Sequence, residues 1–283
     1  MSSTEEFVAH RELLFSIVYN VLGSVADTED VLQETWLAWS SRSGVDNPRA
    51  YLVRIAVNAA LARRTTINRR KEEYVGPWLP EPMVTPIDPV ERTEAVSLAM
   101  LVVLETLTPL ERAVFVLHEV FGYTQVEIAE IVDRTPVAVR QLAHRARAHV
   151  QARRPRYTAD PHVRLEVTQR FIDAVVGGDL NALMEVLAPD VTLWADGGGK
   201  ARAAGLRPML GRDKIAPLII GDGQRRPVPS LGIRYRAVNG DPSALLLSGD
   251  TPFAVIVLDV EDGQVTGIYA ITNPDKLAHV AVD

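Results

Sequence analysis

The sequence predicts a multidomain protein in which two all-α helical domains are followed by an α+β domain. Three observations predict this fold class. Apolar residues recur at helical spacing up to about residue 155, and no strand pattern occurs before that point. A proline-rich stretch interrupts these helices, and alternating apolar runs separated by turn residues begin only near residue 190. We therefore expect domains at residues 1–75, 93–155 and 158–283, with a linker at residues 76–92.

The composition agrees with this division. A length of 283 residues suits two or three domains, and a hydrophobic content of 47% suffices to bury their cores. The absence of cysteine excludes disulfides and thiolate chemistry. The N-terminal residues lack the apolar run of a signal peptide, and no stretch approaches the roughly 20 apolar residues of a membrane span. The composition therefore predicts a cytoplasmic protein without a membrane partner.

The first domain should consist of three helices. The first buries an apolar stripe made of Phe7, Leu13, Leu14, Ile17, Val18, Val21 and Leu22. Asp27 or Thr28 is expected to cap a second helix that runs to Trp39, and Asn47–Pro48 should open the third. The expected buried side of the third helix is Tyr51, Leu52, Ile55, Ala59 and Ala62.

The second helix carries an acidic and polar side edged by tryptophan. Its members are Asp30, Gln33, Glu34 and Trp36. We do not expect such a side to touch DNA, but it suits a basic protein partner, because complementary charge speeds and orients docking. An ordinary solvated helix face explains these residues equally well.

The third helix carries a basic and polar side. It consists of Arg54, Asn58, Arg63 and Arg64, and it is extended by Arg69, Arg70 and Lys71. Residues of these types suit a DNA strand that is held open. The competing explanation is a basic helix end that the helix dipole stabilises.

The linker is expected to be an extended connector. It has prolines at positions 77, 80, 82, 86 and 89, and no helix or central strand tolerates that density. Trp78 and Leu79 lie between these prolines, and their bulky apolar side chains are costly to leave in water. We therefore expect both to dock on the third domain or on a helical domain.

The second domain ends in a helix–turn–helix. Thr124 and Glu127 form a capping-box pattern, Asp133–Arg134 turn the chain, and Thr135–Pro136 open the second helix. The expected buried residues of the first helix are Val126, Ile128, Ala129, Ile131 and Val132. Those of the second are Val139, Leu142, Ala146 and Val150.

The second of these helices differs in charge from the rest of the chain. Seven arginines and no acid lie between Arg134 and Arg156, whereas the whole chain has a net charge of −6. Segregation of one sign of charge is typical of phosphate binding, and a helix of this kind fits the major groove of DNA. The expected DNA contacts are Arg134, Arg140, Gln141, His144, Arg145 and Arg147. A solvated basic helix at a domain edge is the alternative.

The third domain should begin with two short helices, at about residues 161–176 and 179–187. Strands are expected at residues 190–196, 231–238, 244–249, 253–260 and 265–272, and the turn residues between the later runs predict an antiparallel meander in a curved sheet. Two motifs, DGGGK and NPDKL, follow the first and the last of these strands. Each is a plain turn when taken alone, but we expect both to line the contact with the linker. The residues of this expected contact are Trp78, Leu79, Asp196, Gly197, Gly198, Gly199, Lys200, Asn273, Pro274, Asp275, Lys276 and Leu277.

The motifs of the first two domains resemble those of bacterial sigma factors of the extracytoplasmic-function (ECF) class. The similarity covers about residues 5–154 and lies in DTEDVLQETW, NPRAYLVRIAVNAALARR, TPLERAVFVLHEVFGYTQVEIAEIV and HRAR, in that order. The resemblance implies that core RNA polymerase binds the helix with Asp30, Gln33, Glu34 and Trp36. It also implies that Arg54, Asn58, Arg63 and Arg64 contact the −10 element of promoter DNA, and that the arginine-rich helix contacts the −35 element.

The third domain resembles the SnoaL-like, nuclear-transport-factor-2-like cone, and PWLPEP, DGGGK and NPDKL resemble motifs of the ECF subgroup that carries such a cone. The resemblance implies a module that modulates the sigma factor in cis. Two alternatives stay open: a stand-alone DNA-binding regulator, and a cone that binds a small ligand or acts as an enzyme. Candidate pocket residues are Trp194, Asp196, Tyr235 and Tyr269. No nucleophile–base pair or metal-spaced cluster occurs in the sequence of this domain, so we expect neither catalysis nor a cofactor.

Overall fold

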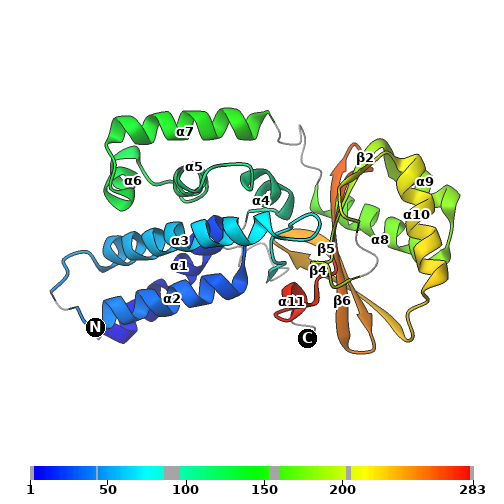
Figure 1. The fold of residues 1–283 in the computed structure, drawn as a ribbon, viewed down its shortest axis with the longest axis horizontal. Helices are drawn as coiled ribbons and strands as arrows, with labels where there is room; N and C mark the ends of the chain where they lie inside the picture. Colours follow the sequence, from blue (N-terminus) through cyan, green and yellow to red (C-terminus); the bar gives the residue numbers. More distant parts are fainter. Residues whose placement is uncertain (1–2, 43, 86–95, 153–159, 202–204, 281–283) are drawn as a thin grey trace. The chain divides into compact units, whose positions relative to one another are not determined.

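The computed structural model describes residues 3–42, 44–85, 96–152, 160–201 and 205–280, which form two compact units. Unit 1 contains the helices of both expected helical domains. Unit 2 contains residues 74–85, which include the first part of the linker, together with the C-terminal part of the chain. Figure 1 labels the α-helices of both units and the strands β2, β4, β5 and β6. The three C-terminal arginines of the basic segment, at positions 153, 154 and 156, lie outside the described residues.

Unit 1 begins with a bundle of three helices, α1 (Ser3–Leu22), α2 (Val25–Ser40) and α3 (Pro48–Glu72). The expected start of α3 is confirmed. The side chain of Asn47 accepts a hydrogen bond from the amide of Ala50, and Pro48 occupies the first turn, where its missing N–H costs nothing.

The expected cap of α2 is wrong. Ser24 caps this helix, because its hydroxyl accepts a hydrogen bond from the amide of Asp27 at 3.1 Å. Thr28 lies one residue further into the helix and donates its own hydroxyl to the Ser24 carbonyl. Asp27 is therefore a first-turn acid near the positive end of the helix dipole rather than a cap.

The buried side of α3 also differs from the expected one. The side chains that are buried are those of Leu52, Val53, Ala56, Val57, Ala60, Arg64 and Ile67. Of the expected set only Leu52 is buried, whereas Ala62 is exposed. The reason is that α3 packs on α1 and α2 and also on α5 and α6, so its apolar stripe is displaced around the helix.

The chain continues with α4 (Leu98–Leu104), α5 (Pro109–Phe115), the short π-helix η2 (Val116–Val120), α6 (Gln125–Val132) and α7 (Pro136–Gln151). The capping box of Thr124 and Glu127 is confirmed, and the left-handed residue Asp133, with φ of 53°, ends α6. Thr135 caps α7 as expected. The buried side of α7 includes Val139, Leu142, Ala146 and Val150, in agreement with the sequence pattern.

One residue of the helix–turn–helix is not where the pattern placed it. Val126 was expected in the core but is exposed. It lies on the side of α6 opposite to Ile128, Ala129, Ile131 and Val132, which bury the helix on their own.

Unit 2 combines a seven-stranded sheet with the helices α8 (Pro161–Gly177), α9 (Leu180–Val186) and α10 (Arg212–Arg225), and a short C-terminal helix, α11 (Pro274–Leu277). The positions of α8 and α9 agree with the sequence prediction. Helix α10 was not expected, because Pro217, Gly221 and Gly223 weaken its pattern, yet Ile215 and Ala216 bury one side of it.

The strands of the sheet are β1 (Val84–Thr85), β2 (Leu187–Asp196), β3 (Met209–Leu210), β4 (Leu231–Val238), β5 (Asp241–Ser248), β6 (Thr251–Glu261) and β7 (Gln264–Ile271), in the spatial order β1-β4-β5-β6-β7-β2-β3. The expected antiparallel meander is confirmed for β4 to β7. Strand β2, however, pairs with β7 in parallel, because helices and hairpins separate the two strands in the sequence. Figure 1 shows α8, α9 and α10 together on one side of the sheet.

Two of the connections in the meander are tight turns. Asn239–Gly240 and Asp262–Gly263 all have positive φ, between 50° and 78°. A two-residue turn of this kind matches the twist of the strands that it joins and favours Asn-Gly or Asp-Gly. This chemistry explains why the hairpins could be placed from sequence.

The two faces of the sheet have different coverings. Side chains of one face, such as Ala244, Ile256 and Ile268, form the main core of unit 2 with α8, α9 and α10. The opposite face carries Trp194, Asp196 and Tyr269, because successive residues of a strand point to opposite sides.

The linker contributes a strand that was not expected. Val84 and Thr85 pair with Val238 and Ala237 on β4, so the predicted absence of strands before residue 155 is wrong at Val84–Thr85. The strand is short and lies at the edge of the sheet, which is the position that a proline-rich segment tolerates.

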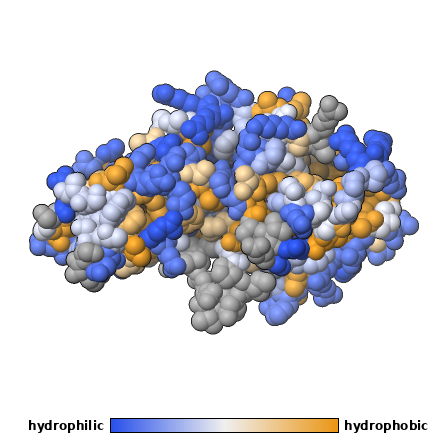
Figure 2. All heavy atoms as spheres, turned by 90° about the horizontal axis from the view of Figure 1, so that it is seen from below, coloured by the Kyte–Doolittle hydropathy of each residue, from blue (hydrophilic) through white to orange (hydrophobic). Residues whose placement is uncertain are grey.

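No helix among the described residues is long and apolar enough to cross a membrane. Figure 2 shows one face of the molecule, on which apolar residues are interspersed among hydrophilic ones.

Candidate functional site

The linker is held in unit 2 by a buried ion pair that binds one residue of its backbone. Asp196, at the end of β2, and Lys276, on α11, lie 2.7 Å apart, and their side chains are 0% and 4% exposed. The Asp196 carboxylate accepts a hydrogen bond from the amide of Leu79 at 2.8 Å, and the Lys276 ammonium donates to the Leu79 carbonyl at 2.5 Å. Both polar groups of Leu79 are therefore satisfied while its side chain is fully buried.

Aromatic rings complete this linker-binding site, which we define as Tyr74, Trp78, Leu79, Asp196, Asn273 and Lys276. The Lys276 ammonium lies 3.6 Å from the centroid of the Trp78 ring, and the Tyr74 ring meets that of Trp78 edge-on at 4.6 Å. A cation over the face of tryptophan is attracted by the ring electrons, and the attraction grows when the pair is withdrawn from water. The Lys276 ammonium thus contacts the Asp196 carboxylate, the Leu79 carbonyl and the Trp78 ring at the same time.

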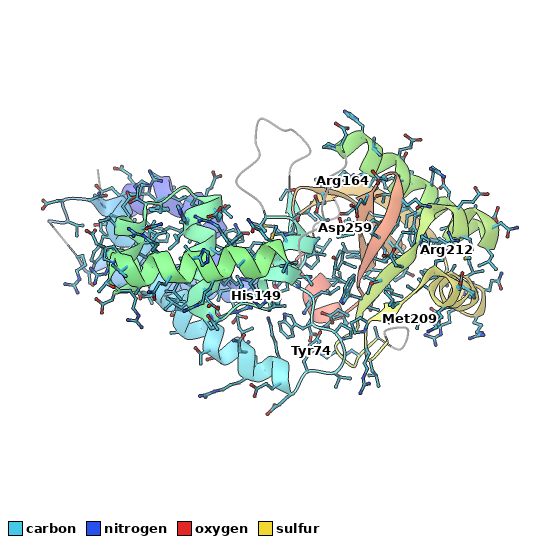
Figure 3. The ribbon with its side chains drawn as sticks, turned by 90° about the horizontal axis from the view of Figure 1, so that it is seen from above. Tyr74, His149, Arg164, Met209, Arg212 and Asp259 are labelled. Atoms are coloured by element: carbon cyan, nitrogen blue, oxygen red, sulfur yellow. The ribbon has the colours of Figure 1, made fainter. Side chains whose placement is uncertain are left out.

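Tyr74 connects the start of the linker to both motifs. Its hydroxyl donates to the Asp196 carboxylate and accepts a hydrogen bond from the Asn273 amide at 2.8 Å. Burial raises the pKa of the Tyr74 hydroxyl, and the hydrogen bond to Asp196 and its negative charge raise it further. Figure 3 labels Tyr74 at this place. The hydroxyl therefore stays protonated and acts as a donor.

The glycines of DGGGK are required by close packing. Gly198 has φ of 59°, and a Cβ on it would lie 2.4 Å from the Asn273 amide nitrogen and 3.0 Å from the Tyr74 hydroxyl. Gly199 has φ of 72°, and a Cβ there would come within 3.2 Å of Val75. A side chain at Gly198 would thus meet two members of the linker-binding site in a backbone conformation that favours glycine.

We expect the Gly198→Ala variant to loosen the linker. The added methyl group must displace Asn273 or Tyr74, and positive φ adds strain, so the exchange should cost about 1–3 kcal/mol. Hydrogen–deuterium exchange at residues 74–79 measures the effect as faster exchange. Gly249→Ala is the matched control, because Gly249 has a similar φ of 61° and no atom near its missing Cβ. Equal linker exchange in the two variants would contradict the packing argument.

The remaining motif residues lie at the rim. The exposed side chains of Lys200 and Asp275 form an ion pair at 2.5 Å. Pro274 occupies the first turn of α11, which Asn273 caps, and Leu277 is buried. Gly197 accepts the turn hydrogen bond from the amide of Lys200. The expected contact set is thus brought together, with Asp196, Asn273 and Lys276 at its centre.

A second attachment of the linker involves β4. The amide of Asn239 donates to the Met83 carbonyl at 2.8 Å, and the Asn239 side chain accepts from the Met83 amide at 3.2 Å. The Thr85 hydroxyl accepts from the amide of Gly240. The linker is therefore bound to unit 2 at two places in succession.

The candidate pocket residues of the third domain do not form one pocket. Trp194 and Tyr269 stack at 4.9 Å on the sheet face that bears Asp196, whereas Tyr235 packs against the helical core on the other face. Burial raises the pKa of Tyr269 above its ordinary range. The four residues therefore cannot bind a single small ligand.

A separate polar group lies where α8 meets the sheet. Arg164 forms an ion pair with Asp241 at 2.5 Å, and burial raises the pKa of the nearby Asp259 carboxyl to about 6, with Asp241 adding to the shift. Figure 3 labels Arg164 and Asp259. Among the described residues, no group of three or more His, Asp or Glu side chains is arranged to hold a metal ion.

The basic side of α7 is exposed, but several of its arginines have intramolecular partners. Arg145 pairs with Glu111 at 3.0 Å, Arg147 with Glu119 at 2.6 Å, and Arg140 donates to Gln125 at 3.2 Å. Arg134 donates to the carbonyl of Asp133. These pairs are near the surface and therefore weak, so a phosphate can compete for each guanidinium.

Gln141 and His144 also lie on the exposed side of α7. Within the described part of the chain, neither side chain forms a hydrogen bond or ion pair. Both polar groups are therefore available for an external partner.

The basic side of α3 is less uniform than the sequence suggested. Arg54 and Asn58 are exposed, and the Asn58 amide donates to the carbonyl of Ile131 on α6 at 2.7 Å. Arg63 lies within 4 Å of Asp27, Asp30 and Glu34 on α2, at 3.7, 3.1 and 3.3 Å. Two of the acidic residues expected to bind a protein partner thus neutralise a residue expected to bind DNA.

Arg64 does not lie on this exposed side. Its side chain is 1% exposed, and it donates to the Leu22 carbonyl and pairs with Glu105, each at 2.7 Å. The sequence pattern missed this because Glu105 is distant in sequence and is brought to α3 only by the fold. The buried Arg64 side chain is therefore inaccessible to DNA.

Glu105 is the centre of a buried charge cluster that joins α3, α4 and α5. Arg64, Lys71 and Arg112 all pair with its carboxylate, and Arg112, at 0% exposed, also donates to the Asn20 carbonyl on α1. Burial alone would raise the pKa of the Glu105 carboxyl, but Arg112, Arg64 and Lys71 together hold it well below its usual range. The Glu105 carboxyl therefore stays ionised.

The acidic side of α2 is exposed at Asp30, Gln33 and Glu34. Trp36 is half-buried rather than exposed, because its ring packs on Phe7 of α1 at 5.3 Å. The α2 surface thus offers carboxylates and an amide beside the accessible part of one aromatic ring.

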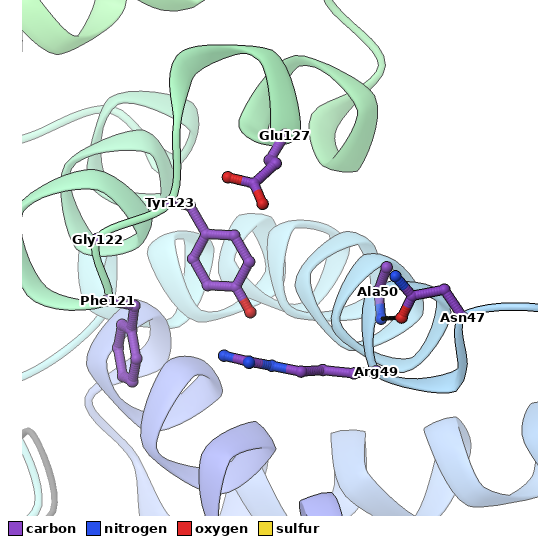
Figure 4. Close-up of a pocket in the computed structure, with 7 residues that line it drawn as sticks. All are labelled: Asn47, Arg49, Ala50, Phe121, Gly122, Tyr123 and Glu127. Atoms are coloured by element: carbon purple, nitrogen blue, oxygen red, sulfur yellow. Dashed lines mark hydrogen bonds between the residues drawn. The ribbon is translucent and has the colours of Figure 1, made fainter.

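Unit 1 also contains a pocket of about 240 Å³, shown in Figure 4. It is lined by Asn47, Arg49, Ala50, Phe121, Gly122, Tyr123 and Glu127. The Arg49 guanidinium faces the Tyr123 ring at 6.0 Å from its centroid. None of these seven residues belongs to the expected site set.

Comparison with known proteins connects these features to one family. Residues 7–70 match the family described as Sigma-70 region 2, and residues 97–150 match Sigma-70, region 4. The ECF RNA polymerase sigma factor SigJ of Mycobacterium tuberculosis is 38% identical over 287 residues, which cover 96% of this chain and 92% of SigJ. The chain belongs to the ECF sigma factor family.

Further relatives include the probable ECF sigma factor SigI of Mycobacterium tuberculosis, which is 30% identical to this sigma factor over 95% of this chain and 92% of SigI. The crystal structure of Mycobacterium tuberculosis SigJ superposes with a TM-score of 0.78 at 34% identity and covers 99% of this chain and 100% of that chain. The similarity therefore includes the C-terminal α+β part of this sigma factor as well as both sigma regions.

Some residues of the candidate site were missed at the sequence level. Tyr74 lies just before the linker, and its aromatic character next to Gly76–Pro77 is the one signal that could have found it. Glu105 and Asn239 carry no local signal, because an isolated Glu in a helix and an Asn in a hairpin turn are ordinary residues. Their roles depend on partners that only the fold supplies.

Proposed function

We propose that this ECF sigma factor binds core RNA polymerase and directs promoter-specific initiation, and that its C-terminal α+β domain modulates this activity in cis through the linker. The observation that supports cis modulation best is the binding of the Leu79 backbone by the buried Asp196–Lys276 pair. The linker joins the two sigma regions, so a domain that binds the linker restricts the distance and orientation that these regions can adopt. The protein acts in the cytoplasm, where core polymerase is found.

We propose the following roles for the domains and their residues. The domains are residues 1–75, 93–155 and 158–283, with the linker at 76–92. Asp30, Gln33, Glu34 and the accessible part of Trp36 bind a basic surface of core polymerase. Arg54, Asn58 and Arg63 contact the −10 element, and Arg134, Arg140, Gln141, His144, Arg145 and Arg147 contact the −35 element. We assign no chemical step to this chain.

Binding of core polymerase would also free Arg63 from two of its three carboxylate partners and leave the pair with Asp27. Asp30 and Glu34 pair with Arg63 in the free protein, and a basic polymerase surface competes for the same two carboxylates. Each exposed pair contributes only about 0–1 kcal/mol, so the exchange is readily reversible.

The test of this function is transcription by core polymerase supplied with the full chain. We expect the full chain to form a complex with core polymerase and to support initiation at a selected promoter. Arg140→Ala should weaken binding to that promoter by about 1–3 kcal/mol with relaxed preference at one base pair, because a bidentate arginine–guanine contact has that strength. Measured affinities for single-base promoter variants give this preference. A full chain that binds DNA but not core polymerase would instead identify a stand-alone regulator, and a loss that is uniform over all bases would make Arg140 a phosphate contact.

A further inference from the structure

The central line of the exposed side of α7 begins with an apolar residue. Val137 follows Pro136 in the first turn of the helix, and its side chain is 61% exposed. At the 3.6-residue period of a helix, Val137 lies in line with Gln141 and His144, opposite to the buried Val139 and Ala146. The first residue at the middle of the exposed side of α7 is therefore a valine.

Exposure alone would not make this valine informative, since single apolar side chains are common on protein surfaces. Its position is informative. The N-terminal residues of a recognition helix are the ones that reach base edges in the major groove. The apolar group that bases present in that groove is the C5-methyl of thymine.

The neighbours of Val137 leave its methyl groups accessible. Arg140 is drawn toward α6 by its hydrogen bond to Gln125, and Arg134 is bonded to the backbone of Asp133. Valine in a helix has one strongly preferred χ1 rotamer, so its two methyl groups are held in a fixed direction. Little conformational entropy is lost when such a side chain meets a partner.

We propose that Val137 is a specificity-determining residue that contacts the C5-methyl of one thymine in the −35 element. This proposal rests on the proposed function, because it requires α7 to lie in the major groove. Val137 selects thymine over the other bases at one position, beside the polar contacts that Arg140 and Gln141 make.

The experiment removes the C5-methyl group of thymine and the methyl groups of Val137 in separate steps. A duplex is first selected by the full chain bound to core polymerase from a library randomised over the −35 element. Each thymine of the selected element is then replaced by deoxyuridine, which lacks only the C5-methyl. For the wild-type protein we expect one position at which this change weakens binding about fourfold, the value for one buried methyl group. For Val137→Ala the same replacement should have no effect at that position.

Val126→Ala is the matched control. Val126 is the exposed valine of α6, at 58% exposed, and the first helix of the motif crosses the DNA backbone instead of entering the groove. This variant should keep the full fourfold sensitivity to deoxyuridine. Val137→Thr, which keeps one methyl group in the same place, should keep part of it.

The outcomes separate this inference from the proposed function. If Val137→Ala remains as sensitive to deoxyuridine as the wild type, or if no thymine of the selected element is sensitive, Val137 does not read a methyl group, although the sigma function stands. If the full chain with core polymerase selects no sequence at the −35 element, the proposed function fails and this inference fails with it.

Discussion

Replacing Glu105 with glutamine should destabilise unit 1 by about 3–5 kcal/mol, the usual cost of removing one partner from a buried ion pair. Glutamine has the shape of glutamate and can still accept hydrogen bonds, so the change isolates the charge. Arg64 and Arg112, at 1% and 0% exposed, would then remain buried without the carboxylate that neutralises them.

The large effect follows from the number of cations that share this one carboxylate. Lys71 also pairs with Glu105, and burial lowers the pKa of its amine to about 7 even with that carboxylate present. Removal of the negative charge therefore leaves two guanidinium cations near one another in a poorly hydrated place, beside an amine that gives up its proton. Arg112 also donates to the Asn20 carbonyl on α1, and Arg64 donates to the Leu22 carbonyl at the end of that helix. Repulsion between the two guanidinium groups would therefore weaken the packing of α4 and α5 on α1 and α3. We expect the contact of α6 with α3, which includes the Asn58–Ile131 hydrogen bond, to open more often as well.

Urea denaturation followed by the helical circular dichroism signal measures the loss, since unit 1 contains most of the long helices. Glu119→Gln is the matched control, because Glu119 pairs with Arg147 near the surface, where both side chains are more than a third exposed. An exposed pair of this kind contributes less than about 1 kcal/mol. If the two glutamine variants unfold at the same urea concentration, the cluster around Glu105 does not stabilise unit 1 in the way its burial implies.

Sequence reasoning succeeded where the deciding interaction is local. The Asn47 cap, the Thr124–Glu127 capping box and the hairpin turns at Asn239–Gly240 and Asp262–Gly263 each depend on residues within a few positions of one another. Such patterns can be read directly, because the side chain and the backbone group that it satisfies are close in sequence.

Sequence reasoning failed where the interacting residue is distant in the sequence. Arg64 lies among polar residues of α3 and was expected on the exposed side, yet Glu105, 41 positions away, makes a buried environment favourable for its charge. The parallel pairing of β2 with β7 likewise depends on how the helices of unit 2 pack, not on either strand alone. Helix α10 was missed because Pro217 and two glycines lower its intrinsic propensity, and burial of Ile215 and Ile220 overrides them.

The linker-binding site shows both behaviours. The motifs that form it could be named from the sequence, and the burial of Leu79 follows from its apolar character. The pattern presented Lys276 as a residue beyond a strand end, however, and gave no sign that its ammonium is buried on Asp196. A charged residue is almost never fully buried unless it is paired, so the pairing had to be observed before the burial could be expected.

The second large effect should come from Lys276→Met. Methionine fills a similar volume, but the Asp196 carboxylate would stay at 0% exposed without its cation, and the Leu79 carbonyl would lose its donor. Trp78 would lose the ammonium over its ring in the same step. We expect a cost of about 3–5 kcal/mol, expressed as release of the linker from unit 2 rather than as global unfolding, because the main core on the other face of the sheet is untouched.

Hydrogen–deuterium exchange over residues 74–85 measures this release, with the largest acceleration expected at the Leu79 amide. Lys200→Met is the matched control from the same pair of motifs. Its ion pair with Asp275 has both side chains more than half exposed and should change linker exchange little. The double variant Asp196→Asn with Lys276→Met removes both charges together and should recover part of the protection, because no uncompensated charge remains.

In a promoter assay with core polymerase, the output of each variant should change in the order of its linker exchange, since the linker is the element through which the C-terminal domain is proposed to act. Faster linker exchange in Lys276→Met with unchanged promoter output would separate the contact from regulation, and equal exchange in Lys276→Met and Lys200→Met would show that the buried pair does not hold the linker.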